Sequence, residues 1–241
     1  MVQATPYDKR LFGRGLLFTL VALALLGLLS AATDEGGVAL LERIGRVLPL
    51  VPVAAAMATG LVVAQQRSRG EERALSAMGA RPERTSAPAA LGASLVALAA
   101  ALAIGLGPAL PIGGFFPQPP NAPAYRDEGT RFVSTGEGIA VDLEGEIEII
   151  EKRSEVSLPL PRGARGSAAI TTALSGLALC LAIARTRREN LGRSIAVISA
   201  FAVATLLAFQ LAAASRLTPV ASTVPAALVL GATLRSYRRP T

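Results

Sequence analysis

The feature that most constrains this chain is the spacing of its charged residues, which leaves six long windows free of Asp, Glu, Lys and Arg. A bilayer core about 30 Å thick is crossed by roughly 20 apolar helical residues, so windows of this length are typical of membrane spans. The chain is therefore predicted to be an α-helical integral membrane protein with six transmembrane helices in a 3+3 arrangement. The windows cover residues 15–33, 47–66, 85–125, 166–184, 194–215 and 217–234.

The third window is longer than one span, and its second part is rich in Pro and Gly, which are typical of a loop. We expect the third helix to end near Ile112, so that residues 1–112 hold helices 1–3 and residues 167–241 hold helices 4–6. The second and sixth spans contain prolines, where we expect kinks packed against protein. The expected kink sites are Pro49, Pro52, Pro219 and Pro225.

The first window has an alternative interpretation, a signal peptide, because basic residues precede the apolar run and the small residues Ser30, Ala31 and Ala32 end it. The even number of helices favours a span. With the N-terminus inside, fifteen of the 24 Lys and Arg residues fall on the cytoplasmic side, as the positive-inside rule expects. We therefore expect a multi-pass protein of the bacterial inner membrane with both termini cytoplasmic, and we interpret the net charge of +7 as topology rather than nucleic-acid binding.

The composition excludes several kinds of chemistry. The chain has no His and one Cys, which leaves no metal site, no disulfide framework and no His-based catalytic site. Neither lysine, Lys9 nor Lys152, lies in a Gly-rich phosphate-binding loop. We expect no catalytic residue, no cofactor and no nucleotide site, so any ATP is bound by another chain. Inside the spans, Gln210 is expected in tight packing and Cys180 as a small buried apolar residue.

Residues 113–166 differ from the rest of the chain, because apolar and polar residues alternate in several short runs separated by turn residues. The alternation is clearest at Ile139, Val141, Ile147 and Ile149, and a further run follows at 156–160. A period of two indicates strands, so this segment is predicted to form a small antiparallel β-domain of three or four strands between helices 3 and 4. Two roles remain open for it, a cap on the helices and a docking surface.

A short amphipathic helix is predicted at about residues 70–79, between the second and third spans. The stretch from Glu71 to Met78 favours a helix, Gly79 is placed to end it, and Ala74, Leu75 and Met78 form a small apolar face. One interpretation is a helix lying on lipid headgroups. The other is a coupling helix that fits a groove on a cytoplasmic partner, where Glu71 or Glu72 pairs with a basic residue.

The order of these parts resembles the LptF/LptG (YjgP/YjgQ) family, the permeases of the lipopolysaccharide-export ABC transporter. The resemblance rests on three spans, an outer β-domain, three more spans and the motif E-x-x-A-L-x-A-x-G-x-x-P after the second span. The motif residues are Glu71, Ala74, Leu75, Ala77, Gly79 and Pro82. The proline-containing start of the second span, Gly192-Arg193 before the fifth and the prolines entering the sixth are also similar.

The resemblance implies a permease that pairs with a second six-span permease and binds a dimeric cytoplasmic ATPase, LptB-like, through the helix that carries Glu71, Glu72, Ala74, Leu75, Met78 and Gly79. It further implies that lipopolysaccharide or a related lipid enters between the two permeases and is lifted to the outer domains. The family's outer domain is a jellyroll, and residues 113–166 are too few for one. The periplasmic domain is therefore expected in a shortened form.

Phosphate groups of such a lipid would require basic residues at the outer ends of the helices. Arg43, Arg46 and Arg216 are the basic residues near that boundary outside the β-segment, and they are expected either to contact an anionic headgroup or to anchor the helices at the interface. The leading hypothesis is a permease subunit of an ABC-type lipid exporter. The alternative is a membrane scaffold, without transport, whose periplasmic cap binds an envelope partner.

Overall fold

A computed structural model describes residues 5–33, 39–80, 82–116, 125–127, 131–134, 139–142, 147–149, 160–186 and 191–238 of the chain. The chain divides into two compact units. The first combines Met1–Phe116 with Pro161–Thr241, and the second is Pro117–Leu160.

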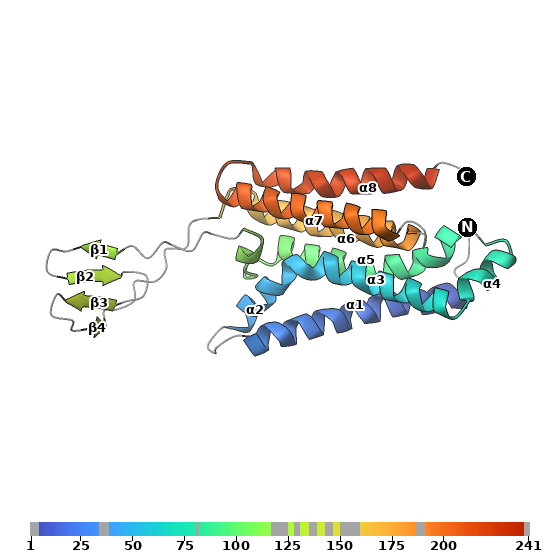
Figure 1. Cartoon of the computed structure of the whole chain (residues 1–241), viewed down its shortest axis with the longest axis horizontal. Coiled ribbons are helices and arrows are strands. Elements are labelled where there is room, and N and C mark those ends of the chain that lie inside the picture. The colour runs from blue at the N-terminus through green and yellow to red at the C-terminus, as the bar shows by residue number, and fades with distance from the viewer. Residues whose placement is uncertain are drawn as a thin grey trace. The chain divides into compact units, whose positions relative to one another are not determined.

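The first unit is helical (Figure 1). Its α-helices are α1 (Pro6–Thr33), α2 (Leu40–Val47), α3 (Val51–Ser68), α4 (Glu71–Ala77), α5 (Pro82–Leu106), α6 (Ala164–Arg185), α7 (Leu191–Ala213) and α8 (Thr223–Arg238). The 3₁₀ turns among the described residues are η1 (Leu48–Leu50), η2 (Gly113–Phe115) and η4 (Pro219–Ser222).

Among the residues that the structure describes, five helical stretches are long and apolar enough to cross a membrane, so the chain is a multi-pass membrane protein. They are Pro6–Thr33, Leu40–Ser68, Thr85–Leu106, Ala164–Arg185 and Ala196–Ala213. The sixth predicted span differs from the expectation, because Pro219–Arg235 is a shorter apolar helix. Pro219 opens a 3₁₀ turn, and the 16 residues of α8 that follow cover only about 24 Å at 1.5 Å per residue.

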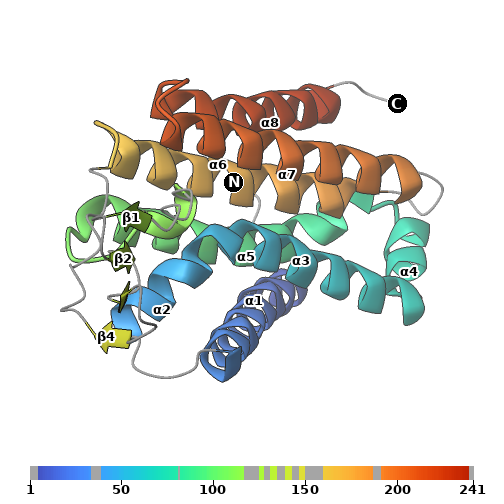
Figure 2. The ribbon, with the colours of Figure 1, turned by 60° about the vertical axis from the view of Figure 1, so that its left-hand side comes forward.

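Helices α5 and α6 pack against each other along the middle of the first unit, with α3 beside both of them. Helix α1 covers α3 and α5, whereas α8 packs on α6 (Figure 2). The backbones of α1 and α5 approach closely at two glycines. A Cβ added to Gly15 would clash with the carbonyl oxygen of Ala89, and one added to Gly92 would clash with that of Phe12. Small residues that allow such an approach are typical of helix pairs in membranes.

In the second span, both prolines lie near the 3₁₀ turn that separates α2 from α3. Pro49 lies in η1, which interrupts the helical stretch between α2 and α3, and Pro52 lies in the first turn of α3, where its missing N–H leaves no helical bond unmade. Helix α5 ends at Leu106 rather than near Ile112. The reason is local, because Gly107 and Pro108 follow directly and a proline cannot continue the helix.

Arg165, in the first turn of α6, donates hydrogen bonds to carbonyl groups in the last turn of α5 and in the segment directly after it. Its Nη1 donates to the oxygens of Ile104 and Gly107 at 3.1 and 2.6 Å, and its Nη2 donates to those of Pro108 and Leu110 at 3.0 and 2.9 Å. The last carbonyl groups of a helix have no partner within the helix. Arg165 therefore supplies, from the second half of the chain, the donors that the end of α5 lacks.

The largest cluster of buried side chains lies at the end of the bundle that holds α2, η1, η2 and the start of α6. Phe115 and Phe116 pack against Phe209 of α7, with ring centroids 5.5 and 5.3 Å apart. Such tilted and edge-on contacts are favoured between aromatic rings. The cluster fixes the chain after α5 against α7, another contact between the two halves of the sequence.

Among its described residues, the second unit has the short strands β1 (Tyr125–Asp127), β2 (Arg131–Ser134), β3 (Ile139–Asp142) and β4 (Ile147–Ile149). Consecutive strands pair antiparallel, in the order β1-β2-β3-β4. Val141 lies opposite Ile147 in the register of β3 and β4, and both side chains are exposed. Most of the further predicted run at 156–160 lies outside the described residues.

Candidate functional site

The short helix α4 occupies the stretch in which the sequence predicted a helix. Gly70 precedes it in a left-handed conformation, with φ of +72°, and Glu71 and Glu72 form its first turn. The helix ends at Ala77, and Gly79 lies in the turn that follows, where its φ of +85° suits a residue without a side chain and Ala80 N–H donates to the Leu75 carbonyl at 3.0 Å. A helix of seven residues is too short to be stable alone, so its position depends on contacts with the rest of the chain.

The predicted site residues on α4 divide into two faces. Glu71 and Glu72 are partly buried against the bundle, and Leu75 is also partly buried. Ala74 and Gly79 are exposed, and Met78 has 75% of its surface exposed. The predicted apolar face is therefore largely uncovered by the chain itself.

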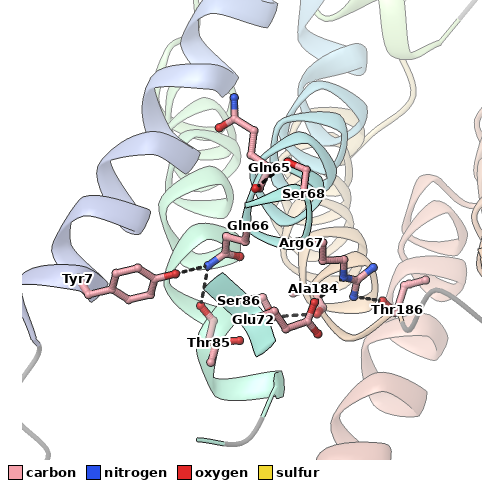
Figure 3. Close-up of polar contacts among 10 residues, drawn as sticks. All are labelled: Tyr7, Gln65, Gln66, Arg67, Ser68, Glu72, Thr85, Ser86, Ala184 and Thr186. Carbon is pink, nitrogen blue, oxygen red and sulfur yellow. Dashed lines mark hydrogen bonds and ion pairs between the residues drawn. The ribbon is translucent and has the colours of Figure 1, made fainter. Parts of the chain in front are cut away.

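The first contact that holds α4 runs to the start of α1. The hydroxyl of Tyr7 donates to Glu71 Oε2 at 2.9 Å and accepts from Gln66 Nε2 at 3.0 Å. The Gln66 amide also donates to the carbonyl of Thr85 in α5, at 3.4 Å (Figure 3). Because only 3% of Gln66 is exposed, these bonds satisfy a buried amide. Gln66 thus joins α3 to both α1 and α5, and Tyr7 extends the link to α4.

The second contact that holds α4 runs to the end of α6. Arg67 Nε donates to Glu72 Oε2 at 2.8 Å, and Arg67 Nη2 donates to the carbonyl of Thr186, directly after α6 (Figure 3). Both partners of this ion pair are about two-thirds buried, with 30% and 31% of their side chains exposed. Close by, the Ser86 hydroxyl of α5 donates to the Ala184 carbonyl at 2.8 Å.

Tyr7, Gln66, Arg67 and Thr186 are parts of this site that the sequence did not identify. Gln66 ends a window without charges and was therefore counted as part of an apolar span. Gln210 was the polar residue predicted to pack tightly inside the spans. That prediction is wrong for packing within this chain, because Gln210 is exposed on α7. Cys180 is buried, as predicted.

The three arginines proposed for an anionic headgroup lie on two different elements. Arg43 and Arg46 belong to α2, and Arg46 Nη2 pairs with Glu42 Oε1 at 3.2 Å on the surface. Arg216 is exposed just beyond the end of α7. An exposed ion pair of this kind contributes at most about 1 kcal/mol.

The site around α4 is built to hold a helix in place. Within the parts of the chain that the structure describes, no group of three His, Cys, Asp or Glu residues is placed to hold a metal ion. The polar groups of the site are bonded to one another and to backbone carbonyls.

No family model matches the chain, and a search of curated proteins finds no match. The fold and the site define a multi-pass helical membrane protein that carries a short helix fixed to the ends of its long helices.

Proposed function

We propose that this chain is the permease subunit of an ABC-type exporter that moves lipopolysaccharide or a related lipid out of the bacterial inner membrane, driven by a separate cytoplasmic ATPase. The observation that carries the proposal is α4, a helix with an uncovered outer face and an inner face whose Glu71 bonds to Tyr7 of α1 and whose Glu72 bonds to Arg67 of α3. A helix of this kind can receive a push from a partner and pass it to the spans. In this account the permease performs no bond chemistry of its own.

The outer face of α4 defines the chemistry of the partner. Arg73, Ala74, Ala77 and Met78 are exposed, so the face combines an apolar patch with a positive charge. The carboxylates of Glu71 and Glu72 are bonded inside the chain, which differs from our expectation that one of them meets a basic residue of the partner. The groove on the ATPase is therefore expected to be apolar with an acidic rim.

The same proposal assigns the sides of the membrane. We place α4, both termini and the start of α7 in the cytoplasm, which satisfies the distribution of Lys and Arg. Helix α8 with η4 then serves as the sixth span, completing three spans on each side of the β-domain at residues 113–166. A short helix can cross where the bilayer thins locally or where neighbouring protein covers its ends.

The second permease is expected to pack on α1 and α7. Only 11% of the most apolar window of α1 and 22% of that of α7 is buried, against 56% for Leu40–Ser68 and for α6. Exposed Gln210 on α7 supports this assignment, because a polar amide is costly against lipid and is readily satisfied by another protein. Arg43, Arg46 and Arg216 would then contact the anionic headgroup of the lipid near the outer boundary.

Co-purification tests this function. Arg73→Glu reverses the exposed charge on α4, and Lys9→Glu makes the same reversal at an exposed residue of α1 as a matched control. We expect the wild-type chain and Lys9→Glu to recover a protein with a Gly-rich phosphate-binding loop from detergent extracts, and Arg73→Glu to lose it. Equal recovery of that ATPase with all three chains, or its recovery with none, would reject the proposal.

A scaffold without transport activity is the second candidate, and one observation favours it. Val141 and Ile147 face each other across β3 and β4, with 38% and 71% of their surfaces exposed. An exposed apolar pair on a small sheet can bind an envelope partner. Normal lipid export in a deletion strain, together with the loss of an envelope complex, would favour the scaffold over the permease.

A further inference from the structure

Two consecutive residues at the end of α3, Gln66 and Arg67, reach in different directions. Gln66 bonds to Tyr7 of α1 and to the Thr85 carbonyl of α5. Arg67 bonds to Glu72 of α4 and to the Thr186 carbonyl after α6. Neighbouring residues on a helix point about 100° apart, so one turn of α3 can serve both sides of the bundle. The end of α3 is thus the point from which both connections begin.

Tyr7 closes the first connection through a single atom. Its hydroxyl oxygen accepts the Gln66 amide hydrogen while its own hydrogen goes to Glu71 Oε2. A hydroxyl that donates and accepts at once polarises both bonds and strengthens each of them. Since Glu71 is the first residue of α4, this bond fixes the beginning of the helix to α1.

The second connection fixes the next residue of α4, Glu72, to the other half of the chain. Arg67 holds the carboxylate with Nε and the Thr186 carbonyl with Nη2. Removing the guanidinium would break both of these bonds at once. The two connections therefore act on adjacent residues of one short helix and lead to α1 in the first half of the chain and α6 in the second.

We infer that Tyr7 and Arg67 are positioning residues that clamp α4 to both halves of the bundle, so that α4 shifts only together with the ends of α1 and α6. If α4 is the coupling helix, the clamp is the connection through which its movement reaches the long helices, and this role of the clamp rests on the proposed function. Its existence is a property of the isolated chain. A displacement of α4 would move α1 through Glu71 and Tyr7, and would move α6 through Glu72 and Arg67.

Amide hydrogen exchange of the purified full chain in detergent tests the clamp without any ATPase. Tyr7→Phe keeps the ring and removes the hydroxyl, and Arg67→Gln removes the ion pair. Each is expected to speed exchange across residues 71–80 by roughly three- to tenfold, because each removes a bond on which this segment depends. The control is Thr33→Val, which removes a hydroxyl from the other end of α1, where it bonds only within that helix. It is expected to leave residues 71–80 unchanged.

Exchange across residues 164–180, the part of α6 away from the Arg67 contact at Thr186, monitors general unfolding and is expected to stay the same in every variant. A double-mutant cycle then separates a direct bond from a general weakening. Glu71→Leu, which removes both accepting carboxylate oxygens, and Tyr7→Phe are expected to have clearly non-additive effects on exchange at 71–80, since each removes one partner of the same bond. Unchanged exchange in both Tyr7→Phe and Arg67→Gln, or additive effects in the cycle, would overturn the clamp. Failure to co-purify an ATPase would instead reject the proposed function and leave the clamp standing.

Discussion

The hydroxyl of Tyr7 lies 2.9 Å from Glu71 Oε2, although the two residues are 64 positions apart in the chain. This bond places the beginning of α4 beside the beginning of α1. A helix of seven residues has little stability of its own in water, so long-range bonds of this kind decide where it lies. The position of α4 is therefore a property of the whole bundle rather than of the loop that contains it.

The buried amide of Gln66 is the first target for substitution. Gln66→Leu removes the donor to Tyr7 and to the Thr85 carbonyl, and a buried group left without its partner costs about 1–3 kcal/mol. Gln65→Leu is the matched control, because the neighbouring side chain is only partly buried. We expect thermal unfolding in detergent to occur at a lower temperature for Gln66→Leu and to change little for Gln65→Leu. Equal shifts for both variants would contradict the assignment.

The contact between α1 and α5 predicts a contrast between two glycines. A Cβ on Gly92 would meet the carbonyl of Phe12, whereas Gly27 has nothing within 4 Å. We expect Gly92→Ala to destabilise the protein by about 1–3 kcal/mol, because backbone cannot move aside as a side chain can. Gly27→Ala is expected to have no harmful effect, since Ala favours a helix over Gly. Thermal unfolding of the two variants in the same detergent makes the comparison, and a Gly92→Ala protein as stable as Gly27→Ala would show that the helices do not approach so closely.

The elements that could be predicted from the sequence are those set by local pattern. The charge-free windows predict the long helices. The helix-favouring stretch that begins at Glu71 predicts α4, and Gly79 predicts where that helix stops. The sixth span was overestimated because hydropathy does not register that Pro219 starts a 3₁₀ turn. The third helix was predicted to end near Ile112 because apolar residues continue to that point, whereas α5 ends at Leu106, before Gly107 and Pro108.

The contacts of the site could not be predicted, because they join residues that are distant in the chain. Glu71 was expected to face a partner, and nothing local indicates that Tyr7 occupies its carboxylate. Arg67 directly follows the second charge-free window, and nothing local indicates that its guanidinium bonds Glu72 and the Thr186 carbonyl. The sequence alone does not show whether a charged residue at the end of a span contacts water, lipid headgroups or another helix.

Arg165 provides a test of how the two halves of the chain are joined. Its guanidinium donates to four carbonyl groups at the end of α5 and beyond, those of Ile104, Gly107, Pro108 and Leu110. We expect Arg165→Gln to lower the free energy of unfolding by about 2 kcal/mol, because bonds to a charged donor are among the stronger ones. The exposed Arg162 provides the control, since Arg162→Gln removes the same charge three residues earlier, in the turn before α6. Chemical unfolding in mixed micelles would measure both, and indistinguishable curves would show that the carbonyl contacts contribute nothing.

The most direct test of the central claim is photo-cross-linking from the outer face of α4 in living cells. A photoreactive residue at Met78, which has 75% of its surface exposed, would be compared with one at Lys9 on α1. The account predicts that Met78 forms a cross-link to a protein that contains a G-x-x-x-x-G-K-[ST] loop and hydrolyses ATP, and that Lys9 does not. Cross-links from Met78 to lipid alone would contradict it and identify α4 as a helix that lies on the membrane surface.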